Sequence, residues 1–159
     1  MSRSMSTEAF DGSGIRRWLV ALMLLSLIGA GDSGYLLWKH WTGGSSFCQP
    51  GGCDLVTQGE YAEVRGIPLA AIGLAGYLTL LCLAAMAAWS AKPSAVGAIA
   101  AISGIGVVLS AFLVYLQVAV IRTICSWCIL SAFAMASIFI LSVLLLRQLR
   151  HLERPQWAE

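Results

Sequence analysis

The sequence predicts an all-α integral membrane protein, a bundle of four transmembrane helices with an outer loop between the first two. Three observations lead to this fold class. Of the 159 residues, 58% are hydrophobic and only 11% are charged, whereas soluble domains carry about 25% charged residues. Four apolar segments are each long enough to cross a hydrocarbon core of roughly 30 Å. A backbone that crosses lipid must satisfy its own hydrogen bonds, so these segments are expected to be helices.

The first apolar segment, Trp18–Trp38, contains one charged residue, Asp32. Its basic start and the small residues before Asp32 also resemble a cleaved signal peptide. The apolar character resumes after Asp32 in "YLLW", which favours a membrane span over a leader. A carboxylate inside a membrane is costly and is by default a candidate for function. The alternatives are that Asp32 faces the lipid headgroups or bonds to Ser33 and nearby backbone groups.

The other three segments, Ile67–Trp89, Ala95–Ile121 and Cys125–Leu146, contain no charged residue. The segment Ala95–Ile121 is the longest and must tilt or extend past the membrane interface. Tryptophans lie at or near several segment ends, where amphipathic rings prefer the headgroup region; these are Trp18, Trp38, Trp41 and Trp89. The predicted organisation is a tail over residues 1–17, a membrane domain over 18–146 with an outer loop at 39–66, and a tail over 147–159.

The distribution of Lys and Arg predicts the orientation, because cytoplasmic loops carry an excess of these residues. If the four spans alternate in direction, most of the basic residues share one side: Arg3, Arg16, Arg17, Lys92, Arg147, Arg150 and Arg154. Only Lys39, Arg65 and Arg122 lie on the other side. Both tails are therefore expected to be cytoplasmic, and the loop 39–66 is expected to face outward.

Four of the five cysteines then fall on the outer, oxidising side of the membrane. Cys48 and Cys53 lie in the outer loop, within "FCQPGGC". Cys125 and Cys128 lie at the outer end of the fourth span, within "TICSWC". Cys82 lies deep in the second span, where a role as a small apolar packing residue is expected.

Cys125 and Cys128 are spaced i, i+3, which brings both side chains to one helix face and within reach of a disulfide. A helix N-terminus offers free N–H groups and a positive dipole, which stabilise a thiolate and lower its pKa. Arg122 would add to this effect if it pointed toward the sulfurs. A static disulfide that ties the start of the helix is the alternative.

Cys48 and Cys53 are separated by Gln-Pro-Gly-Gly, which is typical of a tight turn. A disulfide across so small a loop gains little loop-closure entropy, which favours an exchangeable disulfide over a structural one. Two dithiol pairs on one side of a membrane suggest a relay by thiol–disulfide exchange. Zinc binding is the rival use, although four-cysteine zinc sites favour two Cys-x-x-Cys pairs and an oxidising compartment works against thiolate–zinc sites.

Composition and motifs also limit the kinds of molecule that the protein could bind. The net charge of +2 and the lack of a basic cluster interleaved with aromatic residues argue against nucleic acid. Without a nicotinamide site, electrons from a dithiol need an acceptor that dissolves in the membrane lipid. A quinone, either ubiquinone or menaquinone, is the natural candidate. Asp32 is then a candidate to deliver protons as the quinone becomes quinol.

These residues resemble the vitamin K epoxide reductase family, in its bacterial disulfide-forming branch without a fused thioredoxin domain. The resemblance covers roughly residues 16–146. It rests on the motifs "GDSGYLLWKHWTG", "FCQPGGCDLV", "YAEVRGIPLAAIGLAGY" and "CSWCILSAF". The related DsbB-type quinone reductases place their Cys-x-x-Cys pair in the first outer loop, so the reversed order here favours the vitamin K epoxide reductase type.

The resemblance implies a role for each cysteine. Cys48 would exchange with a separate DsbA-like protein of thioredoxin fold, and Cys53 would pass the electrons to Cys125. Cys128 would face the quinone. In one departure from the family pattern, Gln58 and Gly59 stand where the family usually places serines near the head group, which argues against reduction of the epoxide itself.

The predicted function is that of a membrane thiol:quinone oxidoreductase that reoxidises an extracytoplasmic disulfide donor in a bacterial inner or cell membrane. The enzymatic alternative is a vitamin K epoxide or quinone reductase. The alternative from a different class is a non-catalytic membrane protein that is stapled by cysteines or binds a metal.

Overall fold

The computed structural model describes residues 5–43, 63–64, 66–90 and 93–153. In chain order the elements are helix α1 (Met5–Thr42), strands β1 (Glu63–Val64) and β2 (Ile67–Pro68), helices α3 (Leu69–Ser90) and α4 (Pro93–Tyr115), the π-helical turn η1 (Leu116–Ile121) and helix α5 (Ser126–Glu153). The two strands form a short antiparallel hairpin, in which Val64 pairs with Ile67.

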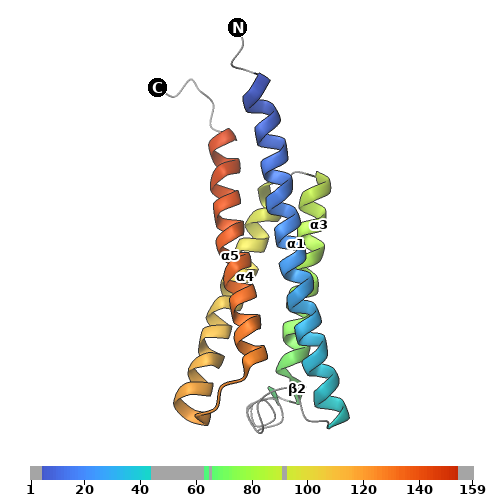
Figure 1. The fold of residues 1–159 in the computed structure, drawn as a ribbon, viewed down its shortest axis with the longest axis vertical. Helices are drawn as coiled ribbons and strands as arrows, with labels where there is room; N and C mark the ends of the chain where they lie inside the picture. The colour runs from blue at the N-terminus through green and yellow to red at the C-terminus, as the bar shows by residue number, and fades with distance from the viewer. Residues whose placement is uncertain (1–4, 44–62, 65, 91–92, 154–159) are drawn as a thin grey trace.

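The four long helices run alternately up and down (Figure 1). The start of α1 and the end of α5 lie at one end of the bundle, whereas β2 and the start of α5 lie at the other. The described residues contain four stretches long and apolar enough to cross a membrane: Gly14–Thr42, Leu69–Trp89, Ser94–Ile121 and Ser126–Arg150. The predicted membrane bundle of four helices is therefore confirmed.

The helices differ from the predicted apolar segments at their ends. Helix α1 begins at Met5 and α5 ends at Glu153, so parts of both predicted tails are helical. The segment Ala95–Ile121 is α-helical only as far as Tyr115 and closes with the π-helical η1. Apolar composition predicts where a helix crosses lipid, but it does not report where the hydrogen-bond pattern changes or where a helix continues into water.

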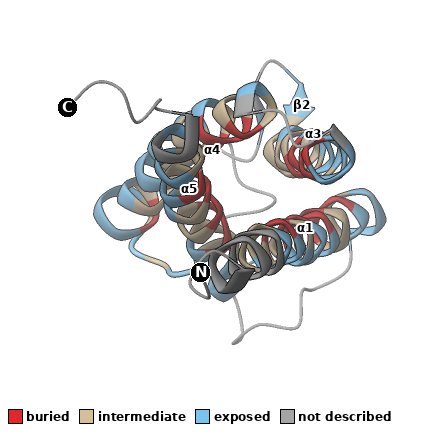
Figure 2. Cartoon of the chain, turned by 90° about the horizontal axis from the view of Figure 1, so that it is seen from above, coloured by how far each residue is buried: buried red, intermediate tan, exposed pale blue. Residues whose placement is uncertain are grey.

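The side chains are distributed as expected for a bundle surrounded by lipid (Figure 2). The buried faces of the helices point toward one another and carry fully buried residues, among them Leu22, Leu80, Ile99, Ile138 and Leu145. The outer faces carry large exposed apolar side chains such as Leu24, Ile28, Val108 and Phe133. An apolar surface of this extent would promote aggregation in water, whereas lipid tails solvate it.

Buried serines inside the bundle bond to the backbone of their own helices. The hydroxyls of Ser26 and Ser103 donate to the carbonyls four residues earlier, at 2.8 and 2.6 Å. This pattern satisfies each hydroxyl without a partner on another helix. These serines are therefore accounted for structurally and are not candidates for chemistry.

Two glycines allow neighbouring helices to approach closely. A Cβ atom at Gly29 of α1 would overlap the ring of Tyr77 of α3. A Cβ atom at Gly104 of α4 would lie 3.1 Å from the ring of Phe139 of α5. Small residues at such contacts are typical of helix packing in membranes, where van der Waals contact drives association.

Cys82 does not pack inside the bundle, and that prediction was wrong. Its side chain is exposed on α3, whereas Leu80 and Ala84 are fully buried. Because a helix turns about 100° per residue, a residue midway between two inward-facing positions points outward. Cys82 therefore faces the lipid and does not contribute to the core.

Gly29→Ala is expected to lower the thermal midpoint of unfolding, because the added methyl group overlaps the Tyr77 ring and separates α1 from α3. Overpacking of this kind costs about 1–3 kcal/mol. Gly31→Ala in the same helix is the matched control, since a Cβ atom there meets nothing within 4 Å. Thermal unfolding of both variants in detergent, followed by circular dichroism, makes the comparison. Equal midpoints would contradict the close contact at Gly29.

Candidate functional site

The Cys125–Cys128 pair is the part of the predicted site that lies within the described residues. Both cysteines lie at the start of α5, at the end of the bundle that carries the β hairpin (Figure 1). Trp127, between them, packs against Tyr35 of α1 with ring centroids 5.1 Å apart. This contact holds the start of α5 against the last turns of α1.

Cys48 and Cys53 lie outside the described residues, but the residues on either side of them are placed. Helix α1 ends at Thr42, and the chain is described again from Glu63. His40 Nε2 lies 3.1 Å from Glu63 Oε1. The two ends of the predicted outer loop are therefore held together, at the same end of the bundle as Cys125.

Cys125 occupies the N-cap position of α5. Its carbonyl accepts the N–H of Ile129 at 3.1 Å, which is the first hydrogen bond of the helix. Its Sγ atom accepts the N–H of Cys128 at 3.3 Å, the bond that a side chain at an N-cap normally accepts from the third helical residue. The Sγ atom also accepts the Cys128 thiol, with the sulfurs 2.7 Å apart. A small movement would bring the sulfurs to the roughly 2.05 Å of a disulfide.

This environment favours a thiolate at Cys125. The Cys128 thiol, which donates to Cys125 Sγ, lowers the pKa of Cys125 below its ordinary value. Backbone N–H groups of Cys128 and Trp127 act in the same direction, against the desolvation of this fully buried residue. Arg122 is exposed and does not contribute to this shift. The helix N-terminus therefore has the predicted effect on Cys125, whereas Arg122 does not.

Gln117 fixes the chain between η1 and α5. Arg122 adopts a left-handed conformation with φ 54°, and its N–H bonds to the Gln117 carbonyl. The same carbonyl accepts the N–H of Thr123 at 3.0 Å. The side chain of Gln117, only 3% exposed, accepts the N–H of Cys125 at 3.0 Å through Oε1. One residue thus satisfies three N–H groups of the non-helical link and sets the position of Cys125.

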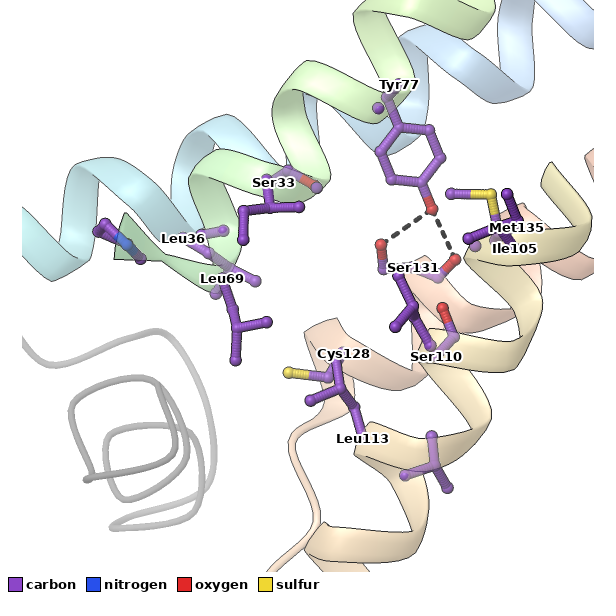
Figure 3. A pocket seen from close by; sticks show the side chains of 18 of the residues that line it. Ser33, Leu36, Leu69, Tyr77, Ile105, Ser110, Leu113, Cys128, Ser131 and Met135 are labelled. Atoms are coloured by element: carbon purple, nitrogen blue, oxygen red, sulfur yellow. Dashed lines mark hydrogen bonds between the residues drawn. The ribbon is translucent and has the colours of Figure 1, made fainter. Parts of the chain in front are cut away.

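Cys128 borders a cavity of about 300 Å³ inside the bundle. Most of the lining is apolar, from α1, α3, α4 and α5, and includes Leu36, Leu69, Ile105, Leu113 and Met135. Figure 3 shows the Cys128 side chain at the edge of this space, with Leu36 and Leu69 across from it. Hydroxyl groups of Tyr77, Ser110 and Ser131 also line it. The Cys128 thiol therefore borders an apolar chamber with few polar groups.

Tyr77 and Ser131 form the main polar contact in the cavity (Figure 3). The Tyr77 hydroxyl donates to the Ser131 carbonyl at 2.7 Å and lies 2.9 Å from Ser131 Oγ. Because the single hydrogen of the Tyr77 hydroxyl goes to the carbonyl, the Ser131 hydroxyl is the donor in the second bond. This pair joins α3 to α5 one turn after Cys128.

Asp32 lies next to this polar contact. It is 5% exposed, and neither carboxylate oxygen has a hydrogen-bond partner among the described residues. Ser131 is the polar side chain beside it, and Asp32 is close enough to act electrostatically on Tyr77, Cys125 and Cys128. Asp32 therefore neither faces the headgroups nor bonds to Ser33, the alternatives that the sequence left open.

The sequence identified Cys125, Cys128 and Asp32 but missed Gln117, Tyr77 and Ser131. A polar side chain inside an otherwise apolar span is the only signal that these three residues give, and buried serines elsewhere give the same signal without a site. Among the described residues no group of three or more His, Cys, Asp or Glu side chains is arranged to hold a metal ion. The zinc alternative would involve Cys48 and Cys53, which lie outside those residues.

Comparison with known families agrees with this arrangement. The sequence profile of the vitamin K epoxide reductase family matches residues 20–143, from the first span to near the end of the fourth. The match includes Asp32, the cysteine pair of α5 and every described residue of the cavity named above. The chain therefore belongs to the vitamin K epoxide reductase family, whose members are membrane oxidoreductases that use quinones.

Proposed function

We propose that the protein is a membrane thiol:quinone oxidoreductase that reoxidises an extracytoplasmic disulfide donor of thioredoxin fold. Electrons pass from the donor to Cys48–Cys53, then to Cys125–Cys128, and then to a membrane quinone. The observation that carries this proposal is the position of Cys128, which contacts Cys125 Sγ on one side and borders the apolar cavity on the other.

The cavity suits the head group of a quinone. Its volume of about 300 Å³ is at the lower end of the range for ligand sites, so a small planar ring fits but a long isoprenoid tail does not. Ser110 supplies a hydroxyl that can donate to a ring carbonyl, while the hydrogens of the Tyr77 and Ser131 hydroxyls are used in their own contact. Ile72 of α3 and Ile105 of α4 line the cavity and are also exposed, which suits a tail that leaves between these helices into lipid. A quinone bound there would supply a two-electron acceptor.

The first exchange begins with the Cys125–Cys128 disulfide. The Cys53 thiolate attacks Cys125, a Cys53–Cys125 bond forms, and Cys128 leaves with the electron pair. The Cys48 thiolate then attacks Cys53, which re-forms Cys48–Cys53 and releases Cys125 as a thiolate. A thiol of low pKa leaves faster in thiol–disulfide exchange. The hydrogen bonds that lower the pKa of Cys125 therefore favour this second step.

The predicted orientation places the exchange on the outer side of the membrane. The first and last helical residues of the bundle share one end (Figure 1), and that end carries the predicted excess of Lys and Arg. The hairpin and the cysteine pair share the other end. A donor outside the cytoplasm would then meet Cys48 without crossing the bilayer.

Cys48→Ala, Cys53→Ala, Cys125→Ala and Cys128→Ala are each expected to abolish quinone reduction driven by a reduced thioredoxin-fold donor. Each substitution removes one sulfur from a chain of direct exchanges. Cys82→Ala is the control, because its side chain faces outward and such changes usually alter stability by less than about 0.5 kcal/mol. Quinone absorbance in purified, reconstituted protein gives the rate. Near-normal turnover of Cys125→Ala would remove the α5 pair from the mechanism.

Cys48→Ala is expected to trap a disulfide between Cys53 and Cys125, because no second thiol remains in the loop to displace Cys125 from Cys53. Mass spectrometry of non-reduced digests detects the cross-linked peptides. Cys48→Ala combined with Cys125→Ala is the control and should show no such link. If Cys53 is free while Cys125–Cys128 stays oxidised in the presence of reduced donor, the two pairs do not communicate and the relay is excluded.

Cys48 is expected to react with a membrane-impermeant maleimide on intact, reduced spheroplasts. The reason is the charge distribution, which puts the loop 39–66 outside. Ser4→Cys in a background that also carries Cys48→Ala and Cys53→Ala is the opposite control and should be labelled only after permeabilisation. Labelling of Cys48 only after the membrane is opened would invert the orientation and contradict a donor outside the cytoplasm.

A further inference from the structure

The buried carboxyl group of Asp32 has no partner among the described residues. Neither of its oxygens has a hydrogen-bond partner there, and no basic side chain in that part of the chain forms an ion pair with it. A charged carboxylate buried without a partner is costly, whereas a protonated carboxyl group avoids most of that cost. A carboxyl group in this environment contributes little to the stability of the fold, so we looked to the reaction for its role.

The groups that face Asp32 are those of the reaction. Helix α1 packs against α3 and α5. From α3 the titratable group facing Asp32 is Tyr77, and from α5 and the residue before it the titratable groups are Cys128 and Cys125. Ser131 is the polar side chain beside Asp32, and its hydroxyl bonds to the Tyr77 hydroxyl. Asp32 therefore lies beside a pair of hydroxyls that line the cavity.

Redox change at the cysteine pair alters the charge near Asp32. In the reduced pair, the hydrogen bonds at the cap of α5 stabilise negative charge on Cys125, while in the disulfide this charge is absent. Two negative charges close together in a dry interior disfavour each other. Ionisation of Asp32 is therefore opposed when the pair is reduced and is less opposed when it is oxidised. By linkage, protonation of Asp32 and reduction of the pair favour each other.

We propose that Asp32 stores one of the two protons of the reaction. It is protonated while Cys125–Cys128 is reduced and gives up its proton when the pair is oxidised. The Cys125 thiolate, the Cys128 thiol, protonated Asp32 and a quinone yield the disulfide, ionised Asp32 and a quinol. The two sulfurs supply two electrons, and Cys128 and Asp32 supply one proton each. The net charge is −1 before and after this step.

Electrons and protons also balance when Cys48 and Cys53 reduce the Cys125–Cys128 disulfide. Cys48 and Cys53 lose two electrons and two protons; Cys128 takes one proton and Asp32 takes the other. This inference rests on the proposed function for the identity of the acceptor, but the coupling between Asp32 and the cysteine pair stands without it.

The test is the equilibrium between dithiothreitol and the Cys125–Cys128 disulfide, measured without quinone. The full chain carries Cys48→Ser and Cys53→Ser, so only the α5 pair exchanges, and alkylation with mass spectrometry reads its state. If Asp32 keeps the second proton, the exchange releases none, and the exchange constant is unchanged over the pH range in which Asp32 is protonated in the reduced protein and ionised in the oxidised protein. In Asp32→Asn that proton is released, and the constant rises about tenfold per pH unit, or about 30 mV for two electrons.

Two further variants control for a purely structural effect. Asp32→Glu restores a carboxyl group and is expected to keep the constant independent of pH. Ser26→Ala also removes a buried polar group from α1, one that bonds only within its own helix, and is expected to leave the pH profile unchanged. If Asp32→Asn does not fold, the infrared difference spectrum of the reduced and oxidised wild-type pair replaces it, with a protonated carboxyl band expected only in the reduced state.

The outcomes separate this inference from the proposed function. A wild-type constant that rises tenfold per pH unit, or an Asp32→Asn constant that stays flat, overturns the storage of a proton on Asp32 even if quinone turnover is normal. Conversely, a flat wild-type profile and a steep Asp32→Asn profile support it even if no quinone is reduced. In that second case the thiol:quinone function fails and the coupling at Asp32 remains.

Discussion

The site depends on the non-helical link between η1 and α5 and on the hydrogen bonds that its backbone N–H groups make. Backbone that leaves the helical pattern near lipid is tolerated only where its polar groups find partners. Gln117 supplies these partners with its carbonyl and its side chain. Because α5 restarts at Ser126, Cys125 becomes its cap and Cys128 lies one turn further, beside the cavity. A continuous helix would have no free N–H groups at Cys125 and no stabilised thiolate.

A second contact sets the cavity. Tyr77 reaches Ser131 of α5 only because Gly29 of α1 leaves space for its ring. This one aromatic side chain therefore spaces three helices and presents its hydroxyl to the chamber beside Cys128. Helix packing and the polar contact of the cavity thus depend on the same residue.

The sequence predicts the bundle and the reactive pair because both leave local signals. The length of each apolar segment predicts a membrane span. The i, i+3 spacing of two cysteines at the end of a span predicts the Cys125–Cys128 pair. Sequence does not predict the link through Gln117, since a hydrogen bond across eight residues and a π-helical turn leave no periodic pattern. The position of Cys82 was wrong because a uniformly apolar helix does not reveal which face is inside. Cys48 and Cys53 remain predictions, as they lie outside the described residues.

The two cysteines of α5 lie in different environments, and this difference gives the site its direction. Cys125 is fully buried yet accepts a backbone N–H and a thiol, so negative charge is stabilised there, toward the end of the bundle that faces the loop. Cys128 keeps its proton in that bond and borders the apolar chamber. Negative charge is thus stabilised where we propose exchange with the loop, and the proton lies where a quinone would bind. One thiol supplies only one of the two protons that a quinol needs, and in our proposal the other comes from Asp32, which is buried and has no hydrogen-bond partner among the described residues.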